Sequence, residues 1–160
     1  MNLSLDRYPI FTGLTPEELN EIAPHCSVVK IERGSDLFQS GEPATSLFVV
    51  RSGRIELRFD VTCYSATTPF TLDVKSPGDV CGRSALMAPY VYTLTAHATE
   101  DSELLRIDQA GLLQCCESDP SIGYHVMKNI AGIIGQRFEV TRQMLAREIQ
   151  AGLHQKDPLS

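Results

Sequence analysis

Histidine and cysteine are common metal ligands, and cysteine is also a strong nucleophile, so their spacing is the first indicator of site chemistry. The cysteines are odd in number and scattered, with no C-x-x-C pair, at Cys26, Cys63, Cys81, Cys115 and Cys116. Structural zinc sites and disulfide frameworks both need regular, closely spaced ligands or partners. We therefore expect reduced thiols, and the adjacent Cys115 and Cys116 as core or surface thiols that do not bridge each other.

The histidines also lack the spacing of a metalloenzyme. They are His25, His97, His125 and His154, and only His97 falls in a segment with strand character, without an H-x-H companion. An axial haem ligand would be a His or a Cys, so His97 with Cys81 stays a conceivable alternative that no other residue supports. No spacing indicates a nucleophile, base and orienting group. We expect a protein that is not an enzyme and binds no metal.

The elements that must position these residues are mostly short strands. Between residues 26 and 108, β-type runs alternate with turn residues about every eight to twelve positions, which is typical of a barrel or sandwich. A tight hairpin is expected at Ser52-Gly53, and an exposed loop or edge at 61–68. We predict strands at 27–32, 36–39, 46–51, 54–60, 70–74, 93–99 and 102–108.

Helices are expected on both sides of this β region. Thr15-Pro16-Glu17-Glu18 has the N-cap, N1 proline and capping-box glutamate of a helix that runs to about Ile22-Ala23. A short helix is predicted at 109–117 and a long one from about Pro120 to Ala151. We thus expect one domain over residues 1–152, with a β region at about 26–108, helices at about 109–152, and a flexible tail at 153–160.

The long helix carries two apolar stripes, one with Val126, Ile130, Ile133, Val140 and Met144 and the other with Met127, Ile134, Phe138 and Leu145. One stripe can cover the β region, and a surplus stripe normally meets a partner. The alternative is that the whole helix packs on its own barrel. We expect a homodimer in which Ile130→Asp or Gly135→Leu would yield a monomer, with an interface formed by Ile130, Ala131, Ile134, Gly135 and Phe138.

The charge balance argues against a protein that mainly grips a phosphate backbone. Lys plus Arg total 14 against 20 for Asp plus Glu, a formal net charge of −6. The apolar runs are too short to span a bilayer, and the N-terminus has neither a basic n-region nor a long apolar h-region. We expect a cytoplasmic protein without direct nucleic-acid or membrane contact.

Four motifs follow one another along the chain: Ile10-Phe11-x-Gly13-Leu14-x-x-Glu17-Glu18-Leu19, Arg33-Gly34-x-x-Leu37-Phe38-x-x-Gly41-Glu42, Leu47-Phe48-Val49-Val50-x-x-Gly53-x-Ile55, and Pro77-Gly78-Asp79-Val80-Cys81-Gly82-Arg83-Ser84-Ala85-Leu86. In this order they resemble the cyclic-nucleotide-binding domain family. The resemblance implies a mainly β fold with flanking helices: an eight-stranded jelly-roll (double-stranded β-helix) barrel, a short N-terminal helix and a long C-terminal helix.

The last of these motifs stands at the place of the family's phosphate-binding cassette. There, a glycine lets a cyclic phosphate approach a short helix, a glutamate accepts from the ribose, an arginine pairs with the phosphate and a hydroxyl follows. This chain has Gly82, Arg83, Tyr92 and Thr93 at these positions. Since a charge-assisted contact contributes about 1.5–3 kcal/mol, loss of both charged residues should weaken binding of the usual nucleotide well over tenfold.

The two substituted residues leave alternatives open. Arg83 could supply the missing positive charge from the opposite side of the cassette, or be a solvated charge, or pair with Asp79. Tyr92 could donate its O–H to a ligand, stack on a base, or fill the pocket and hold it shut. The candidate ligand is cAMP, cGMP or another small anion, and the candidate binding residues are Gly82, Arg83, Ser84, Ala85, Tyr92 and Thr93.

Two functions follow from the resemblance. The first is a regulatory signalling module in which a small anion binds the cassette and shifts the long helix. The second is a degenerate domain that binds no nucleotide and serves as a dimerising interaction or scaffold protein for an unidentified protein partner. A transcription factor of the catabolite-activator type also needs a helix-turn-helix, and we expect none here because only about 10 residues of this sequence follow Gln150.

Overall fold

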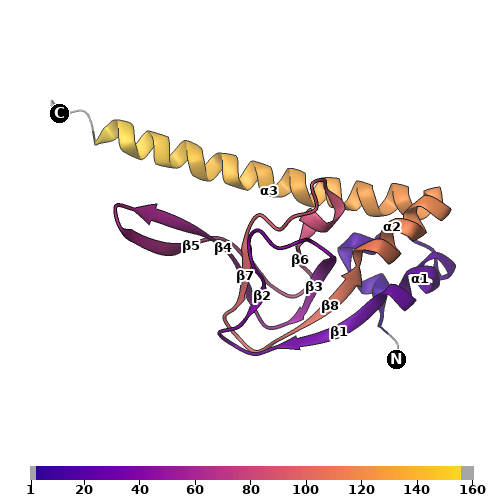
Figure 1. Ribbon diagram of the computed structural model, residues 1–160. Coiled ribbons are helices and arrows are strands. Elements are labelled where there is room, and N and C mark those ends of the chain that lie inside the picture. The colour runs from indigo at the N-terminus through magenta and orange to yellow at the C-terminus, as the bar shows by residue number, and fades with distance from the viewer. Residues whose placement is uncertain (1–2, 156–160) are drawn as a thin grey trace.

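Two antiparallel sheets face each other and are flanked by helices in a computed structural model that describes residues 3–155 (Figure 1). One sheet has the strand order β1-β8-β3-β6, and the other has the order β2-β7-β4-β5. The strands are β1 (Cys26–Ile31), β2 (Asp36–Phe38), β3 (Ser46–Ser52), β4 (Ile55–Cys63), β5 (Ala66–Lys75), β6 (Val80–Cys81), β7 (Thr95–Ala98) and β8 (Ser102–Asp108).

This architecture confirms a mainly β fold with flanking helices. The strands form two separate sheets within the described residues rather than one closed barrel, which corrects that detail of the expectation. Of the predicted loop or edge at 61–68, the exposed edge is confirmed, because β4 runs to Cys63 and β5, which begins at Ala66, is the last strand of its sheet. Val61 and Cys63 alternate with Thr62, but both faces of this hairpin end are exposed, so no buried face distinguishes a strand from a loop there.

The N-terminal segment folds into short helices: η1 (Leu5–Arg7), η2 (Pro9–Phe11), α1 (Pro16–Ile22) and η3 (Ala23–His25). The capping box predicted for α1 is formed. Thr15 Oγ1 accepts a hydrogen bond from Glu18 N (3.2 Å), and Glu18 Oε2 accepts one from Thr15 N (2.8 Å). These bonds satisfy two backbone donors that the helix itself leaves without acceptors.

Replacement of the cap residue should therefore destabilise the protein. Thr15→Ala is expected to lower the free energy of unfolding by about 1 kcal/mol, since one capping bond is lost and the reciprocal one is weakened. Chemical denaturation followed by circular dichroism measures this loss. Thr68→Ala, at an exposed position of β5, is the matched control and should change stability by less than about 0.5 kcal/mol. Equal stability of the two variants would contradict the role given to the cap.

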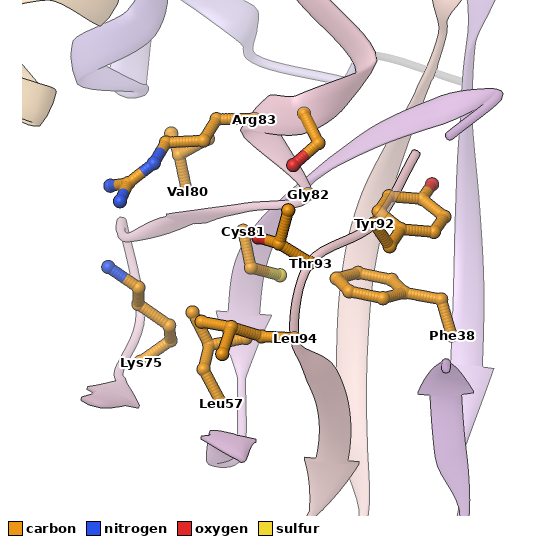
Figure 2. Close-up of a pocket in the computed structure, with 11 residues that line it drawn as sticks. Phe38, Leu57, Lys75, Val80, Cys81, Gly82, Arg83, Tyr92, Thr93 and Leu94 are labelled. Atoms are coloured by element: carbon orange, nitrogen blue, oxygen red, sulfur yellow. The ribbon is translucent and has the colours of Figure 1, made fainter. Parts of the chain in front are cut away.

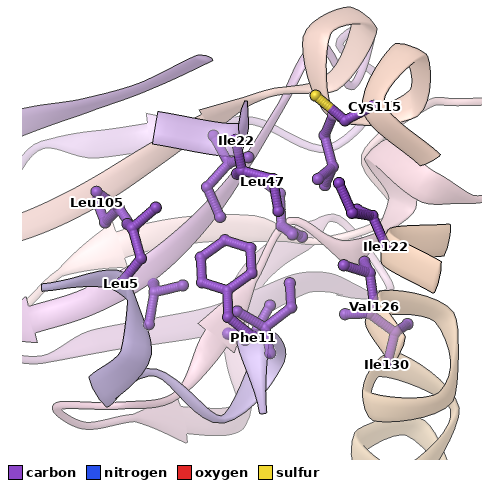
Figure 3. Close-up of a cluster of buried hydrophobic side chains, with 14 residues drawn as sticks. Leu5, Phe11, Ile22, Leu47, Leu105, Cys115, Ile122, Val126 and Ile130 are labelled. Atoms are coloured by element: carbon purple, nitrogen blue, oxygen red, sulfur yellow. The ribbon is translucent and has the colours of Figure 1, made fainter. Parts of the chain in front are cut away.

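The β1-β8-β3-β6 sheet is covered on both faces, and this explains why the sequence of β3 contains a continuous apolar run. The run Leu47–Val50 in β3 is fully apolar because its alternate residues belong to two different clusters. One cluster lies between the two sheets. The other joins the sheet to the helices and is formed by Leu5, Ile10, Phe11, Ile22, Leu47, Val49, Val80, Leu105, Ile107, Leu112, Cys115, Ile122, Val126 and Ile130 (Figure 3).

The C-terminal helices are α2 (Gln109–Ser118) and α3 (Pro120–His154). The first half of α3 packs on the helix-side cluster, while its second half extends past the sheets along the β4–β5 hairpin (Figure 1). Since α3 runs to His154, the tail predicted from residue 153 begins too early, and residues 156–160 lie outside the described residues. Within the described part, no helix combines the length and apolar character required to cross a bilayer.

One predicted interface residue belongs elsewhere. Ile130 is only 4% exposed and packs in the helix-side cluster of its own protomer. Ile134 packs against the edge of the same cluster, whereas Ala131, Gly135 and Phe138 are exposed. The apolar stripe that starts with Val126 thus covers the protomer at its N-terminal end, as one stripe was expected to do.

Candidate functional site

The cassette segment is a turn, a two-residue strand and one turn of helix. After the turn at Pro77-Gly78, β6 pairs with β3, and η4 (Arg83–Leu86) follows Gly82. Gly82 has a φ of 77°, and a Cβ there would lie 3.1 Å from Ser46 O and 3.3 Å from Tyr92 Cε1. A larger residue would meet both backbone strain and crowding, so glycine is required at this position.

A cavity of about 40 Å³ lies beside this segment (Figure 2). Five of the six predicted ligand-binding residues line it, and the sixth, Ala85, is fully buried, with its carbonyl accepting from Gln109 Nε2 at 2.6 Å. Sequence reasoning missed the lining residues that come from other strands, because no local motif marks them. The complete lining consists of Phe38, Leu57, Lys75, Val80, Cys81, Gly82, Arg83, Ser84, Tyr92, Thr93 and Leu94.

Tyr92 packs inward and closes one side of the cavity (Figure 2). Its ring stacks on Phe38, with ring centroids 3.8 Å apart and an interplanar angle of 12°. Its hydroxyl donates to Ser46 O at 2.6 Å and accepts from Ser46 N at 3.3 Å. Burial raises the pKa of Tyr92, although the hydrogen bond to Ser46 opposes that shift. The O–H group is therefore engaged by the backbone, and the ring fills space beneath Gly82.

Arg83 has a different environment. Its side chain is half-buried and forms no hydrogen bond or ion pair within the described residues. The carboxylate of Asp79, one predicted partner, instead accepts from Ser76 N at 2.9 Å. Burial lowers the pKa of Arg83, Asp73 raises it and Arg137 lowers it further. Arg83 is thus a partly desolvated cation at the cavity wall without a direct counter-ion.

Asp73 connects this wall to the long helix. Its Oδ2 lies 2.8 Å from Lys75 Nζ, and its Oδ1 lies 3.1 Å from Arg137 Nη1 on α3. Arg137 Nη2 also donates to Leu72 O at 2.8 Å. Because Lys75 and Arg137 occupy both oxygens of Asp73, Arg83 is a third cation near a single carboxylate.

The conceivable pair His97 and Cys81 does not meet in one cavity. His97 Nδ1 lies 2.7 Å from Asp36 Oδ1 on the outer face of the second sheet, away from the cavity that Cys81 lines. Cys81 is 1% exposed, and desolvation raises its pKa to about 12, as expected for a buried, unreactive thiol. No cluster of three or more potential metal ligands occurs among residues 3–155.

The comparison with known families shows to which family the chain belongs. The family model of the cyclic nucleotide-binding domain matches residues 28–119, which include β1 to β8 almost entirely and the cassette. The chain belongs to the cyclic nucleotide-binding domain family. The expectation drawn from the motifs is confirmed at this level, including the regulatory and signalling role of the family.

Individual relatives agree with this assignment. A candidate cyclic nucleotide-binding protein from Geobacter metallireducens GS-15 is 30% identical with a TM-score of 0.70, and the match covers 82% of this chain and 92% of that one. The N-terminal domain of a Streptomyces coelicolor transcriptional regulator is 26% identical with a TM-score of 0.66 and the same coverage. The Cyclic AMP receptor protein of Thermus thermophilus is 26% identical over 129 residues, 81% of this chain and 56% of that protein. The chain thus spans about half the length of that curated relative and smaller shares of the next two.

Proposed function

We propose that this chain is a regulatory module in which Arg83 recruits a small anion to the cassette cavity. The observation that carries the proposal is a half-buried guanidinium at the cavity wall with no counter-ion of its own. A partly desolvated cation without a partner is costly, and an anionic ligand would offset that cost. The hydroxyls of Ser84 and Thr93 in the same wall add hydrogen-bond donors.

Asp73 could couple ligand binding in the cavity to the position of α3. An anion at Arg83 would also attract Lys75, which shares Asp73 with Arg137. A change in the Lys75–Asp73 pair would alter the strength with which Asp73 retains Arg137 and thus the second half of α3. In this scheme the ligand shifts the population of helix positions by its different affinity for each of them.

The second half of α3 supports a homodimer. From residue 138 on, this half is exposed, yet it carries large apolar side chains, including Phe138, Leu145 and Ile149. Their spacing of seven and four residues places them on one stripe of the helix. A second copy of the same helix is the occupant proposed for that stripe, which would contain Ala131, Ile134, Gly135 and Phe138.

The function is tested by removal of the Arg83 charge. Arg83→Gln should weaken the binding of whichever anion binds by about tenfold or more, because one charge-assisted contact is lost. Isothermal titration calorimetry with cAMP, cGMP and inorganic phosphate measures this change. Arg33→Gln, in the exposed turn after β1, is the control with the same change in charge. Anion binding that is identical in both variants, or absent from the wild type, would overturn the proposal.

The scaffold function has its own supporting observation. Tyr92 and Phe38 fill the side of the cavity opposite Arg83, and a cavity of about 40 Å³ is far smaller than a ligand pocket of roughly 300–1,000 Å³. The double variant Arg83→Glu, Tyr92→Arg reinstates the two family residues. Because Tyr92 is 4% exposed, the new arginine places a charge in the core, so circular dichroism must first show that the variant is folded. Nucleotide binding by this variant, with no anion bound by the wild type, would favour a scaffold that has lost its ligand chemistry.

A further inference from the structure

We propose that the cavity beside Arg83 selects a dianionic tetrahedral oxyanion over the singly charged phosphodiester of a cyclic nucleotide. The selected group would be a free oxyanion or the terminal group of a phosphate monoester. This inference rests on the proposed anion binding at the cassette. It adds the charge class of the ligand, which follows from the charges and the size of this cavity.

The charges that line the cavity have one sign. Among residues 3–155, Lys75 and Arg83 are the only charged residues that line it, and no carboxylate or histidine of this part of the chain does so. The guanidinium of Arg83 and the ammonium of Lys75 extend toward the same side of the cavity, away from Tyr92 and Phe38 (Figure 2). Because Coulomb attraction is proportional to charge, a dianion gains about twice as much from this wall as a monoanion does.

The neighbouring groups do not cancel this positive charge. Asp73 is shared by Lys75 and Arg137, so three cations with Arg83 face one carboxylate. The carboxylate of Asp79 accepts from Ser76 N and lies outside the cavity lining. The carboxylate of Asp79 keeps its negative charge and acts on Cys81 in the cavity lining, so these three cations and two carboxylates leave one positive charge, in a chain whose formal net charge is −6. The wall thus stays positive, and it attracts a dianion more strongly than a monoanion.

The size of the cavity also favours a small tetrahedral oxyanion as the ligand. Its volume of about 40 Å³ corresponds to about three water-sized spheres of roughly 10–15 Å³ each, which suits a tetrahedral oxyanion. The stacked rings of Tyr92 and Phe38 occupy the side away from the two cations (Figure 2). A nucleoside would have to displace that stack or remain outside, whereas an oxyanion between Lys75 and Arg83 would not disturb it.

Calorimetric titrations at constant ionic strength test the selectivity. The probes are sodium sulfate, adenosine 5′-monophosphate and cAMP, all at pH 7.5. We expect sulfate and the monoester to bind at least fivefold more tightly than cAMP. Similar affinities for sulfate and the monoester would assign binding to the oxyanion alone, and tighter binding of the monoester would show that its organic part contributes. Either of these results supports the proposal.

A change in pH separates charge from shape. The second pKa of a phosphate monoester is about 6, so its dianion falls from nearly all of the ligand at pH 7.5 to about a tenth at pH 5. The affinity for the monoester should fall about tenfold over this range, while the affinity for sulfate, which stays a dianion, should hold. No histidine lines the cavity among the described residues, and the sulfate titration reports any change that arises in the protein itself. Affinities for sulfate and the monoester that fall together would contradict the inference.

Substitutions at position 83 complete the test. Arg83→Gln should reduce the preference for the monoester over cAMP, whereas Arg83→Lys retains the charge and should retain most of the preference. Circular dichroism of each variant confirms that it is folded, and Arg33→Gln is again the control. If cAMP binds as tightly as the dianions and Arg83→Gln still weakens it, the dianion inference fails and the anion-binding module stands. If no anion binds, both fail.

Discussion

We expect Phe138→Asp to convert the proposed homodimer into a monomer at micromolar concentration. Phe138 is 68% exposed on the second half of α3, and Leu145 lies two turns further along the same stripe. If two copies of α3 pair along this stripe, an aspartate at position 138 places a charge in the apolar seam. Two such charges, one from each copy, would face each other without a partner and drive the helices apart.

Light scattering coupled to size-exclusion chromatography measures the mass of this variant and of its control. Gln150→Asp adds the same charge to α3 at an exposed position about 120° around the helix from Phe138, so it should leave the mass of the dimer unchanged. A monomeric wild type, or a Phe138→Asp variant with the mass of a dimer, would contradict an interface along α3.

The position of Ile130 changes how the sequence-based version of this test is interpreted. Because Ile130 packs in the core of its own protomer, Ile130→Asp would bury a charge and unfold the chain, so its effect on mass says nothing about the interface. Gly135→Leu is still informative, since an added Cβ would have no neighbour within 4 Å in the protomer. A leucine there would keep the two helices apart only if they approach each other closely at this glycine.

Tyr92→Ala lowers the free energy of unfolding by about 3–5 kcal/mol, the range for truncation of a buried aromatic residue. The ring is 4% exposed and stacked on Phe38, so its removal leaves a hole between the two sheets. Tyr92→Phe keeps the stack but removes the O–H donor from the buried Ser46 carbonyl, which should cost about 1–2 kcal/mol.

Urea denaturation followed by circular dichroism gives both values. Tyr124→Ala, at a position on α3 that is 61% exposed, is the control and should change stability by less than about 0.5 kcal/mol. A loss below about 1 kcal/mol for Tyr92→Ala would mean that the ring is not a structural part of the core. In that case Tyr92 would be free to turn toward a ligand, which was one of the alternatives drawn from the sequence.

The sequence was sufficient wherever structure depends on neighbours along the chain. The capping box at Thr15 and Glu18 was predicted because both bonds join residues three positions apart. A strand was predicted at 54–60 because Ile55 and Leu57 alternate with polar residues, and both are buried where β4 begins. Gly82 was identified from its place in a family motif, and its positive φ gives the physical reason for a glycine at that place.

The β4–β5 hairpin shows where this local reasoning stopped. Its end, Thr62 and Thr67 included, is exposed on both faces, and the pairing that makes it a strand is invisible in the composition of either segment. The same holds for β6, whose two residues form a strand only because they pair with Phe48 and Val49 in β3. Backbone pairing of this kind depends on where another strand lies.

The sequence by itself therefore determined the order of most elements, since local hydrogen bonds and apolar periodicity encode them. The family and the position of the cassette were inferred from the resemblance of four motifs, and the family was confirmed by the match over residues 28–119. Only the tertiary structure decided the chemistry of the cavity. Arg137 and Asp73 lie far apart in the chain, as do Tyr92 and Ser46, and no spacing rule links either pair. Their contacts exist because the sheets and α3 pack around shared apolar clusters, and this packing brings charges and rings from distant segments to one wall.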